Sequence, residues 1–414
     1  MAHRGAPPRV EATTDRRTAW STDRNRTIDP EHSIAILSVT WNKAEDAARV
    51  LAEAAASEGL PLDRTHAVLV DNASDPRVRE LVFDRLRPER VVVNEASRDG
   101  PAAFVESETG HRNALGFASI TLIENRLNLG GCGGFNTAMR YAVGPLEDRA
   151  GRLDRLWLLD DDVLLPSNTF AALAKAIEGD ERAALVGARA VDAGDRATTF
   201  ETTIYFDHDT GLLAPDPSLS DARRAEHEVW AASVGGTRGG AGYAGVREVD
   251  VASACCLLAR RELLDEIGQW DTRYFLYGDD ADWSLRAGAA GHRVLCALDA
   301  VIYHTPWFSK LTPGRAYLAE RNLLWSLGKR SEWRRLLARR SLGLAKRAWR
   351  ELAAAEHARA WFTARAVIDA ARNRGGGPVD PPAKLRLVGA LGVTVRATVS
   401  AIQLALTGAP REHR

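Results

Sequence analysis

Three consecutive carboxylates, Asp160, Asp161 and Asp162, follow an apolar segment of this sequence. Residues of this type can bind a cation or take part in catalysis. Side chains at positions i and i+2 of an extended strand lie on the same side, so Asp160 and Asp162 can point the same way. Two carboxylates in that arrangement suit one hard divalent cation, Mn²⁺ or Mg²⁺. The alternative is a solvated turn whose acids cap a helix, and we favour metal binding.

A glycine-rich segment between Asn128 and Asn136 contains Gly130, Gly131, Gly133 and Gly134. Glycines allow the backbone to approach a ligand closely, and a helix that begins after them can cradle a phosphate or ribose. The segment matches neither the dinucleotide fingerprint nor a P-loop. The alternative is a tight connection between a strand and a helix.

A second acidic cluster, Asp279, Asp280 and Asp282, stands where a helix is expected to begin. Helix capping explains one or two acids in a first turn. A carboxylate here can also act as a general base toward a hydroxyl group. His304 ends another apolar segment, and a neutral imidazole can complete the ligand shell of a divalent metal. His304 is therefore a candidate metal ligand only if it lies beside Asp160 and Asp162.

Short apolar segments alternate with helical ones and must position these residues. We expect strands at 33–40, 67–71, 90–93, 120–123, 156–160, 184–187 and 249–258. We expect helices at 44–58, 136–142 and 169–177, a long flexible loop at 207–247, and a further helix within 306–327. This alternation predicts an α/β fold with a mostly parallel sheet between helices. Ligands bind such sheets beyond the carboxyl ends of the strands, where Thr40, Asp71, Asn128 and Asp160 fall.

Together these elements resemble the inverting family 2 glycosyltransferases of the GT-A fold, and most of all their galactofuranosyltransferase branch, with rhamnosyltransferases nearby. The resemblance covers about residues 33–330 and rests on the order of the motifs. They are Thr40-Trp41-Asn42-Lys43, Asp71-Asn72, the glycine segment after Asn128, Asp160-Asp161-Asp162, Asp279-Asp280-Ala281-Asp282, His304 and Arg321-Asn322.

The resemblance implies a role for each motif. Asp280 is the expected catalytic base, and Asp160, Asp162 and His304 are the expected ligands of Mn²⁺ or Mg²⁺. The expected contacts of the nucleotide sugar are Thr40, Lys43, Asp71, Asn128, Gly130, Gly131, Asp161 and Asp279. The implied donor is a UDP or dTDP sugar, with galactofuranose or rhamnose favoured, and the implied acceptor is a hydroxyl of a glycan or a lipid-linked glycan.

The chain departs from that branch in the expected sugar pocket. Ala254-Cys255-Cys256 stands where the branch has two tryptophans, and Gly278 stands where it has another. Two other functions stay open. One is a nucleotidyltransferase that makes nucleotide sugars, although the glycine-rich, lysine-containing loop usual in that class is missing after Thr40. The other is a non-catalytic protein that binds nucleotide sugars.

Charge is distributed unevenly along the 414 residues, although the formal net charge is zero. Residues 331–414 contain 16 Lys and Arg against 6 Asp and Glu, whereas residues 1–330 contain 39 against 49. We divide the chain into a disordered tail at 1–32, a GT-A catalytic domain at 33–330 and a basic helical region at 331–414.

Apolar residues of the basic region fall on one helical stripe: Trp333, Leu336, Leu337, Leu344, Ala345, Ala348 and Leu352. This pattern is typical of a helix that lies on an anionic membrane. The alternative is a helical subdomain that packs on the catalytic body or forms a contact in a homo-oligomer. Nucleic acid is not an expected partner, because the basic and aromatic residues match no known binding module.

Cysteine spacing and the ends of the chain indicate the compartment. The four cysteines form no C-x-x-C pair, which favours reduced thiols, and residues 1–32 contain no apolar signal segment. Residues 385–406 come nearest to a membrane-spanning helix but are interrupted by Arg386 and Arg396. We expect a cytoplasmic protein, peripheral on the inner face of the plasma membrane if the basic region binds lipid.

Overall fold

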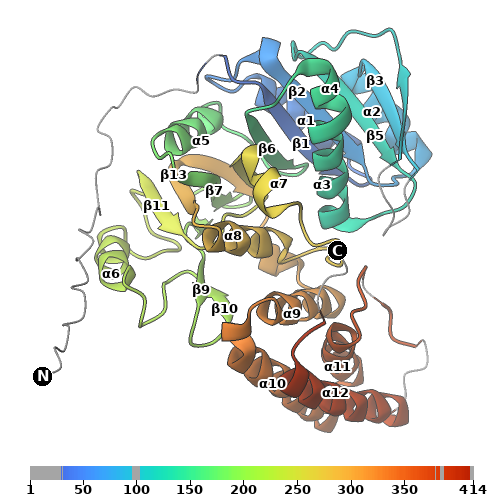
Figure 1. Ribbon diagram of the computed structural model, residues 1–414, viewed down its shortest axis with the longest axis vertical. Helices are drawn as coiled ribbons and strands as arrows, with labels where there is room; N and C mark the ends of the chain where they lie inside the picture. The colour runs from blue at the N-terminus through green and yellow to red at the C-terminus, as the bar shows by residue number, and fades with distance from the viewer. Residues whose placement is uncertain (1–28, 30, 96–102, 378, 383–386, 411–414) are drawn as a thin grey trace, which may run out of the picture.

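The computed structural model describes residues 29, 31–95, 103–377, 379–382 and 387–410, so the tail expected at 1–32 lies almost entirely outside the described residues. Within them, an 11-stranded sheet has the order β11-β13-β7-β12-β6-β1-β2-β5-β3-β4, in which β8 pairs with β7. Figure 1 shows the sheet region at the end of the molecule opposite the C-terminal helices. The strands running in one direction are β3 (Arg90–Asn94), β5 (Ser119–Asn125), β2 (Thr65–Asp71), β1 (Ile34–Thr40), β6 (Arg155–Asp160), β7 (Ala183–Asp192) and β13 (Arg293–His304). The predicted mostly parallel α/β sheet is therefore confirmed.

The remaining strands of this sheet are antiparallel to their neighbours: β4 (Phe104–Glu108), β8 (Thr199–Glu201), β11 (Val246–Val249) and β12 (Cys256–Arg260). β12 lies between β6 and β7 and is antiparallel to both. The single strand expected at 249–258 is wrong, because β11 and β12 are separate strands on different sides of β13 and β7.

The centre of the sheet contains a reversal of strand order at β1. β2 and β5 lie on one side of β1, and β6 lies on the other. The register places Thr40 beside Asp71 and Val39 beside Asp160. Such a switch point is where open α/β sheets bind ligands, beyond the carboxyl ends of the strands. The inner strands are almost entirely buried because helices cover both faces.

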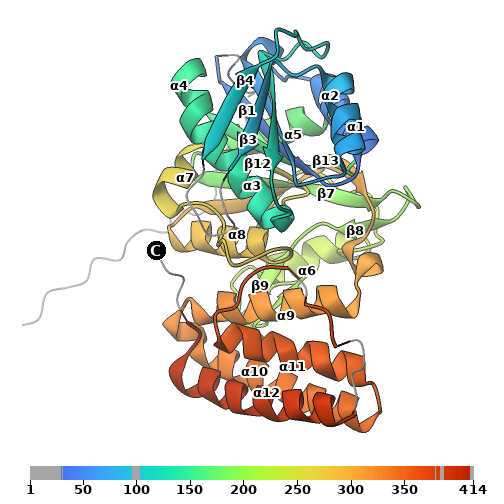
Figure 2. The same ribbon diagram turned by 90° about the vertical axis from the view of Figure 1, so that its right-hand side faces the viewer.

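Two apolar cores lie on the two faces of the sheet. One face is covered by α1 (Ala44–Ala55), α2 (Pro76–Leu86) and α5 (Thr169–Glu178). The other is covered by α3 (Gly130–Tyr141), α7 (Glu262–Ile267) and α8 (Asp279–Ala289), and a π-helix at Ala142–Leu146 and α4 (Glu147–Ala150) continue from α3 (Figure 2).

The glycine-rich segment is itself helical, so the helix expected at 136–142 begins earlier, at Gly130. A Cβ atom on Gly134 would lie 2.4 Å from Cγ1 of Val39, and one on Gly130 would lie 2.1 Å from the carbonyl oxygen of Phe275. The glycines let α3 pack directly on β1 and on the loop that contains Phe275. This contact between helix and strand explains why a segment with poor helix propensity is helical.

The long loop expected at 207–247 is also wrong. It contains β10 (Leu212–Ala214), which pairs with β9 (Tyr205–Asp207), and α6 (Arg224–Ser233). His227 of α6 is fully buried, and its ring nitrogens lie 3.3 Å from the hydroxyl of Tyr205 and 3.0 Å from Asp216. Strands of three residues are too short to show a periodic pattern in the sequence.

The C-terminal part is a bundle of α9 (Pro313–Gly328), α10 (Arg334–Ala353), α11 (His357–Ala371) and α12 (Leu387–Thr407), which confirms the predicted helical extension (Figure 2). α9 lies between the sheet and the other three helices. It is joined to α11 by the hydroxyl of Tyr317, which donates to Asp369 over 2.9 Å, and by the indole of Trp325, which donates to the carbonyl of Ala370 over 3.1 Å. The division at residue 330 stays a prediction.

The apolar stripe of the basic region packs inside this bundle. Trp333, Leu337, Leu344, Ala348 and Leu352 are each at most 8% exposed. The expectation that this stripe meets a membrane is wrong, and the alternative of a packed helical subdomain describes it correctly. A bundle and a membrane surface demand the same pattern from an amphipathic helix.

α12 is long and apolar enough to cross a membrane by length and composition, with a mean hydropathy of 1.5 over 18 residues. The sequence led us to expect no such helix. However, 39% of that segment is buried inside the molecule, and a core helix passes the same test.

Candidate functional site

The predicted metal ligands come together beyond the carboxyl end of β6. One ligand atom from each of Asp160, Asp162 and His304 lies within 4.8 Å of the others. Reciprocal backbone hydrogen bonds between Leu164 and Tyr303, of 2.9 and 3.0 Å, hold the two segments side by side. Two carboxylates and an imidazole form a donor set that can hold Mn²⁺ or Mg²⁺.

Three basic side chains surround Asp162. His304 Nε2 lies 3.0 Å from Oδ1 of Asp162, and the ammonium groups of Lys43 and Lys310 each lie 2.9 Å from Oδ2. Burial disfavours the carboxylate, but these three partners hold the pKa of Asp162 well below its usual range. Sequence reasoning missed Lys310, whose only signal is its place six residues after His304, in a 3₁₀ helix at Trp307–Lys310.

Asp160 and Asp161 have different surroundings. Burial, reinforced by the neighbouring carboxylates, raises the pKa of Asp160 to about 7, although His304 opposes the shift. Asp161 points toward β1, where it accepts a 2.8 Å hydrogen bond from the hydroxyl of Thr40 and lies 3.3 Å from the ammonium of Lys43. Thr40 and Lys43 are thus beside the carboxylate run, while their contact with a nucleotide stays a prediction.

Asp71 is fully buried at the end of β2. Its Oδ2 accepts hydrogen bonds from Arg79 Nε over 3.2 Å and from the amide of Ser74 over 3.3 Å. Its Oδ1 is buried without a hydrogen-bond partner among the described residues. An unsatisfied buried acceptor is costly, so a ligand N–H group would be stabilised here. Sequence reasoning did not identify Arg79.

Asn128 orders the start of α3. Its Oδ1 accepts hydrogen bonds from Asn72 Nδ2 over 3.1 Å and from the amide of Gly130 over 2.8 Å. Packing against Phe275 accounts for Gly130, whereas a Cβ on Gly131 would have an ordinary contact of 3.6 Å with Leu276. Contacts of these residues with a nucleotide stay predictions.

The second acidic cluster begins α8, as expected. The half-buried Asp280 accepts hydrogen bonds from the amides of Ala254 over 3.1 Å and Ala281 over 2.8 Å. Cys255, which follows Ala254 in the chain, accepts a 3.1 Å hydrogen bond through its carbonyl oxygen from the amide of Asp160. The segment 254–255 therefore connects Asp280 directly to the metal-ligand strand. Burial raises the pKa of Asp280, and burial together with Asp280 raises that of Asp279.

Glu201, at the end of β8, is a further acid of this site that sequence reasoning missed. Burial and the charge of Asp280 raise its pKa to about 7, opposed by Arg238, by a hydrogen bond with Ser253 and by His304. It belongs to a three-residue strand and to no recognisable motif, so its position depends on the tertiary fold.

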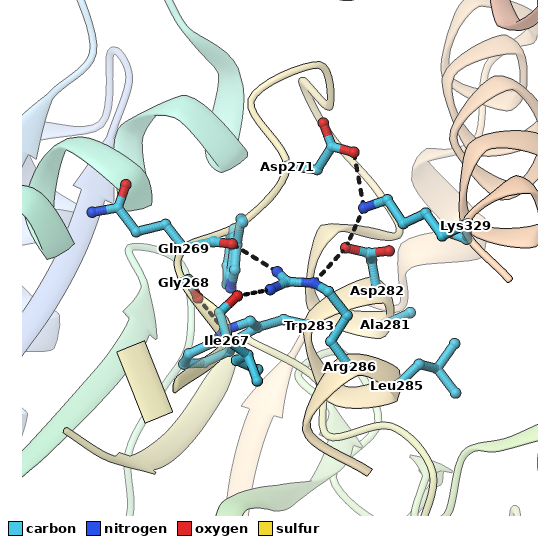
Figure 3. Close-up of polar contacts among 12 residues, drawn as sticks. Ile267, Gly268, Gln269, Asp271, Ala281, Asp282, Trp283, Leu285, Arg286 and Lys329 are labelled. Atoms are coloured by element: carbon cyan, nitrogen blue, oxygen red, sulfur yellow. Dashed lines mark hydrogen bonds and ion pairs between the residues drawn. The ribbon is translucent and has the colours of Figure 1, made fainter. Parts of the chain in front are cut away.

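Asp282 has a structural role instead (Figure 3). Its carboxylate lies 2.7 Å from Lys329 and 3.1 Å from Arg286, and Lys329 also lies 2.8 Å from Asp271. Arg286 donates to the carbonyl of Gln269 over 2.7 Å. This network joins α8 to the C-terminal end of α9.

The loop before α8 is held from the same helix. Asn322 of α9 donates to the carbonyls of Leu276 and Tyr277 over 3.0 and 2.8 Å. Tyr277 and Gly278 both have positive φ, 71° and 77°. α9 thus fixes the turn that presents Asp279 and Asp280.

A sequence profile of the family described as "Glycosyltransferase like family 2" matches residues 30–323. Over 219 residues, or 49% of this chain, the sequence is 26% identical to the galactofuranosyltransferase GlfT2 of Mycolicibacterium smegmatis. The match covers only 30% of that relative's length.

Two similar solved structures cover most of the chain. The mannosyltransferase PcManGT from Pyrobaculum calidifontis, in complex with GDP-Man and Mn²⁺, has a TM-score of 0.44 and 17% identity, and the match covers 94% of this chain and 91% of that one. TarS 1–349 of S. aureus, in complex with UDP, has a TM-score of 0.44 and 13% identity, with 91% and 92% covered.

Proposed function

We propose that this chain, which belongs to the glycosyltransferase-like family 2 and is a glycosyltransferase, transfers a sugar from a nucleoside diphosphate sugar to a hydroxyl of a glycan or lipid-linked glycan. The proposal depends mainly on one observation: ligand atoms of Asp160, Asp162 and His304 lie within 4.8 Å of one another at the switch point of the sheet. The donor we propose is a UDP or dTDP sugar, with galactofuranose favoured and rhamnose second. The partial likeness to GlfT2 supports galactofuranose.

Donor binding is assigned to the residues around the carboxylate run. Lys43 and Lys310 offer two ammonium groups to a diphosphate, and the free Oδ1 of Asp71 offers an acceptor to a nucleoside N–H group. Asp160, Asp162 and His304 would hold Mn²⁺ or Mg²⁺. The other proposed donor contacts are Thr40, Asn128, Gly130, Gly131, Asp161 and Asp279.

Asp280 is the base of the proposed reaction. Its carboxylate accepts the proton of the acceptor hydroxyl while the hydroxyl oxygen forms a bond to the anomeric carbon. The bond from that carbon to the diphosphate oxygen breaks on the opposite face, so the configuration inverts. Because burial raises the pKa of Asp280, its carboxylate is a stronger base than an exposed one. A bound Mn²⁺ or Mg²⁺ would supply positive charge that stabilises the departing diphosphate.

The variant Asp280→Asn tests this assignment, because it keeps the shape of the side chain and removes the base. We expect transfer to fall by about 10²- to 10⁴-fold, while calorimetric affinity for the nucleoside diphosphate in Mn²⁺ stays within about twofold of the parent, since a base toward the acceptor contributes little to donor binding. Asp63→Asn, an exposed change in the 3₁₀ helix at Leu62–Arg64, is the matched control.

Full transfer by Asp280→Asn would remove Asp280 as the base. Loss of nucleotide binding together with transfer would assign Asp280 to donor binding or folding instead.

A further inference from the structure

The outward side of α12 is apolar. Large side chains at helical spacing form one row and are between 40% and 79% exposed: Val388, Leu391, Val395, Val399, Ile402 and Leu406. The opposite side of α12 consists mainly of small residues, including Ala390, Ala397 and Ala401, which are fully buried in the bundle. The helix therefore presents its larger apolar side chains to the outside, the reverse of an ordinary surface helix.

The outward side of α10 lies beside this row and adds cations. The indole of Trp349, 40% exposed, donates a 3.0 Å hydrogen bond to the hydroxyl of Thr398 and so connects the two helices. The exposed cations in line with Trp349 along α10 are Arg335, Arg339, Lys346 and Arg350. We call the row of α12 together with these α10 residues the outer helical face.

The outer helical face contains no acid. Every residue of α10 and α12 is described, and none of their exposed positions is Asp or Glu. Arg335, Lys346 and Arg350 form no ion pair with the described residues. A contact between two copies through the same face would bring cations against cations. A partner surface with an apolar layer beside a negatively charged layer complements both the apolar row of α12 and the cations of α10.

We infer that the outer helical face docks on a bilayer that contains anionic lipids, with α12 lying in the plane of the interface. Apolar side chains of α12 then enter the boundary of the acyl chains, Trp349 lies at the level of the headgroups, and the cations of α10 contact lipid phosphates. α12 does not span the bilayer in this arrangement, because its other side is packed against the bundle. The face is at the end of the molecule away from the sheet (Figure 1), and the inference is independent of the proposed sugar transfer.

Sedimentation with vesicles tests the inference. We expect the full chain to bind vesicles of phosphatidylcholine with phosphatidylglycerol, to bind pure phosphatidylcholine vesicles weakly, and to dissociate as salt rises. The double variant Val395→Glu with Val399→Glu should lower the partition coefficient at least about tenfold, because it places charge in the apolar row. Lys346→Gln with Arg350→Gln should do the same, because each cation contributes to binding an anionic surface.

Val229→Glu is the matched control, since Val229 is 73% exposed on α6 and outside the face. It should leave the partition coefficient unchanged. Failure of the parent chain to bind anionic vesicles would overturn the inference, as would an equal loss in the control. Light scattering on the same variants must show no change in oligomeric state; a dimer that the face variants dissociate, with vesicle binding unchanged, would identify a second copy as the occupant.

Discussion

Asp160, Asp161 and Asp162 are neighbours in the sequence, yet their surroundings give them different chemistry. Asp162 is paired with His304, Lys43 and Lys310, which hold its pKa well below the usual range. Asp161 is bound to the end of β1 through Thr40. Burial, reinforced by the neighbouring carboxylates, raises the pKa of Asp160 to about 7. A cation at this site would stabilise the charged form of Asp160.

Glu201 gives a prediction about pH. Because burial and Asp280 raise its pKa from 4.5 to about 7, the folded state binds a proton that the unfolded state has released between these values. The contribution of Glu201 to the stability of the parent protein therefore falls as pH rises from about 4.5 to 7. Glu201→Gln removes this loss. The free energy of unfolding of the variant minus that of the parent should therefore be larger at pH 8 than at pH 5, by on the order of 1–3 kcal/mol. Urea unfolding at both pH values measures the difference.

Glu181→Gln, at an exposed position, is the control for this measurement and should show the same difference from the parent at both pH values. An identical result for Glu201→Gln would show that the carboxyl of Glu201 is not desolvated in the folded protein.

At the scale of elements, α3 positions the site through its glycines. Gly134 faces Val39 of β1, and the gap leaves no room for a methyl group, whereas Gly131 has an ordinary contact with Leu276. We expect Gly134→Ala to destabilise the protein by about 1–3 kcal/mol, because α3 must move away from β1. Gly131→Ala should be neutral or should stabilise by up to about 1 kcal/mol, because alanine is the better helix former. Thermal unfolding of both variants measures these effects.

Gly131→Ala also tests the predicted nucleotide contact separately from stability. A lower affinity for nucleotide with an unchanged melting temperature would support contact at Gly131. Equal destabilisation by the two variants would contradict the packing of α3 described above.

The elements also show how far the sequence could predict the fold and the site. The parallel strands up to residue 187 were predictable because each is a short apolar segment that ends in polar residues. The glycines of α3 were not, since only the contact with Val39 reveals why they are helical. The ligand set of Asp160, Asp162 and His304 followed from motif order, whereas Lys310 and Glu201 reach the site only through tertiary structure. An amphipathic stripe such as that of Trp333 cannot indicate what covers it.

At the scale of the whole molecule, the helical bundle supports the turn that presents Asp279 and Asp280. Asn322 holds that turn from α9, and α9 depends on α11 through Tyr317 and Trp325. A chain that ends at residue 330 would expose both aromatic side chains, each of which contributes about 1.5–3 kcal/mol by burial. We expect its melting temperature to fall by more than about 10 °C and its affinity for nucleotide to be lost.

Differential scanning calorimetry and nucleotide titration of the truncated chain check this prediction. A truncated chain with the stability and affinity of the parent would show that residues 33–330 form an independent domain, as the sequence division predicts.

Calorimetric titration with a panel of UDP and dTDP sugars, with Mn²⁺ and then with excess EDTA, tests the proposed function most directly. We predict that at least one of these donors binds in the presence of Mn²⁺, and that both EDTA and Asp162→Asn abolish its binding. Binding of none of these donors, or binding that neither EDTA nor Asp162→Asn changes, would contradict the proposal that this site holds a metal and a nucleotide sugar.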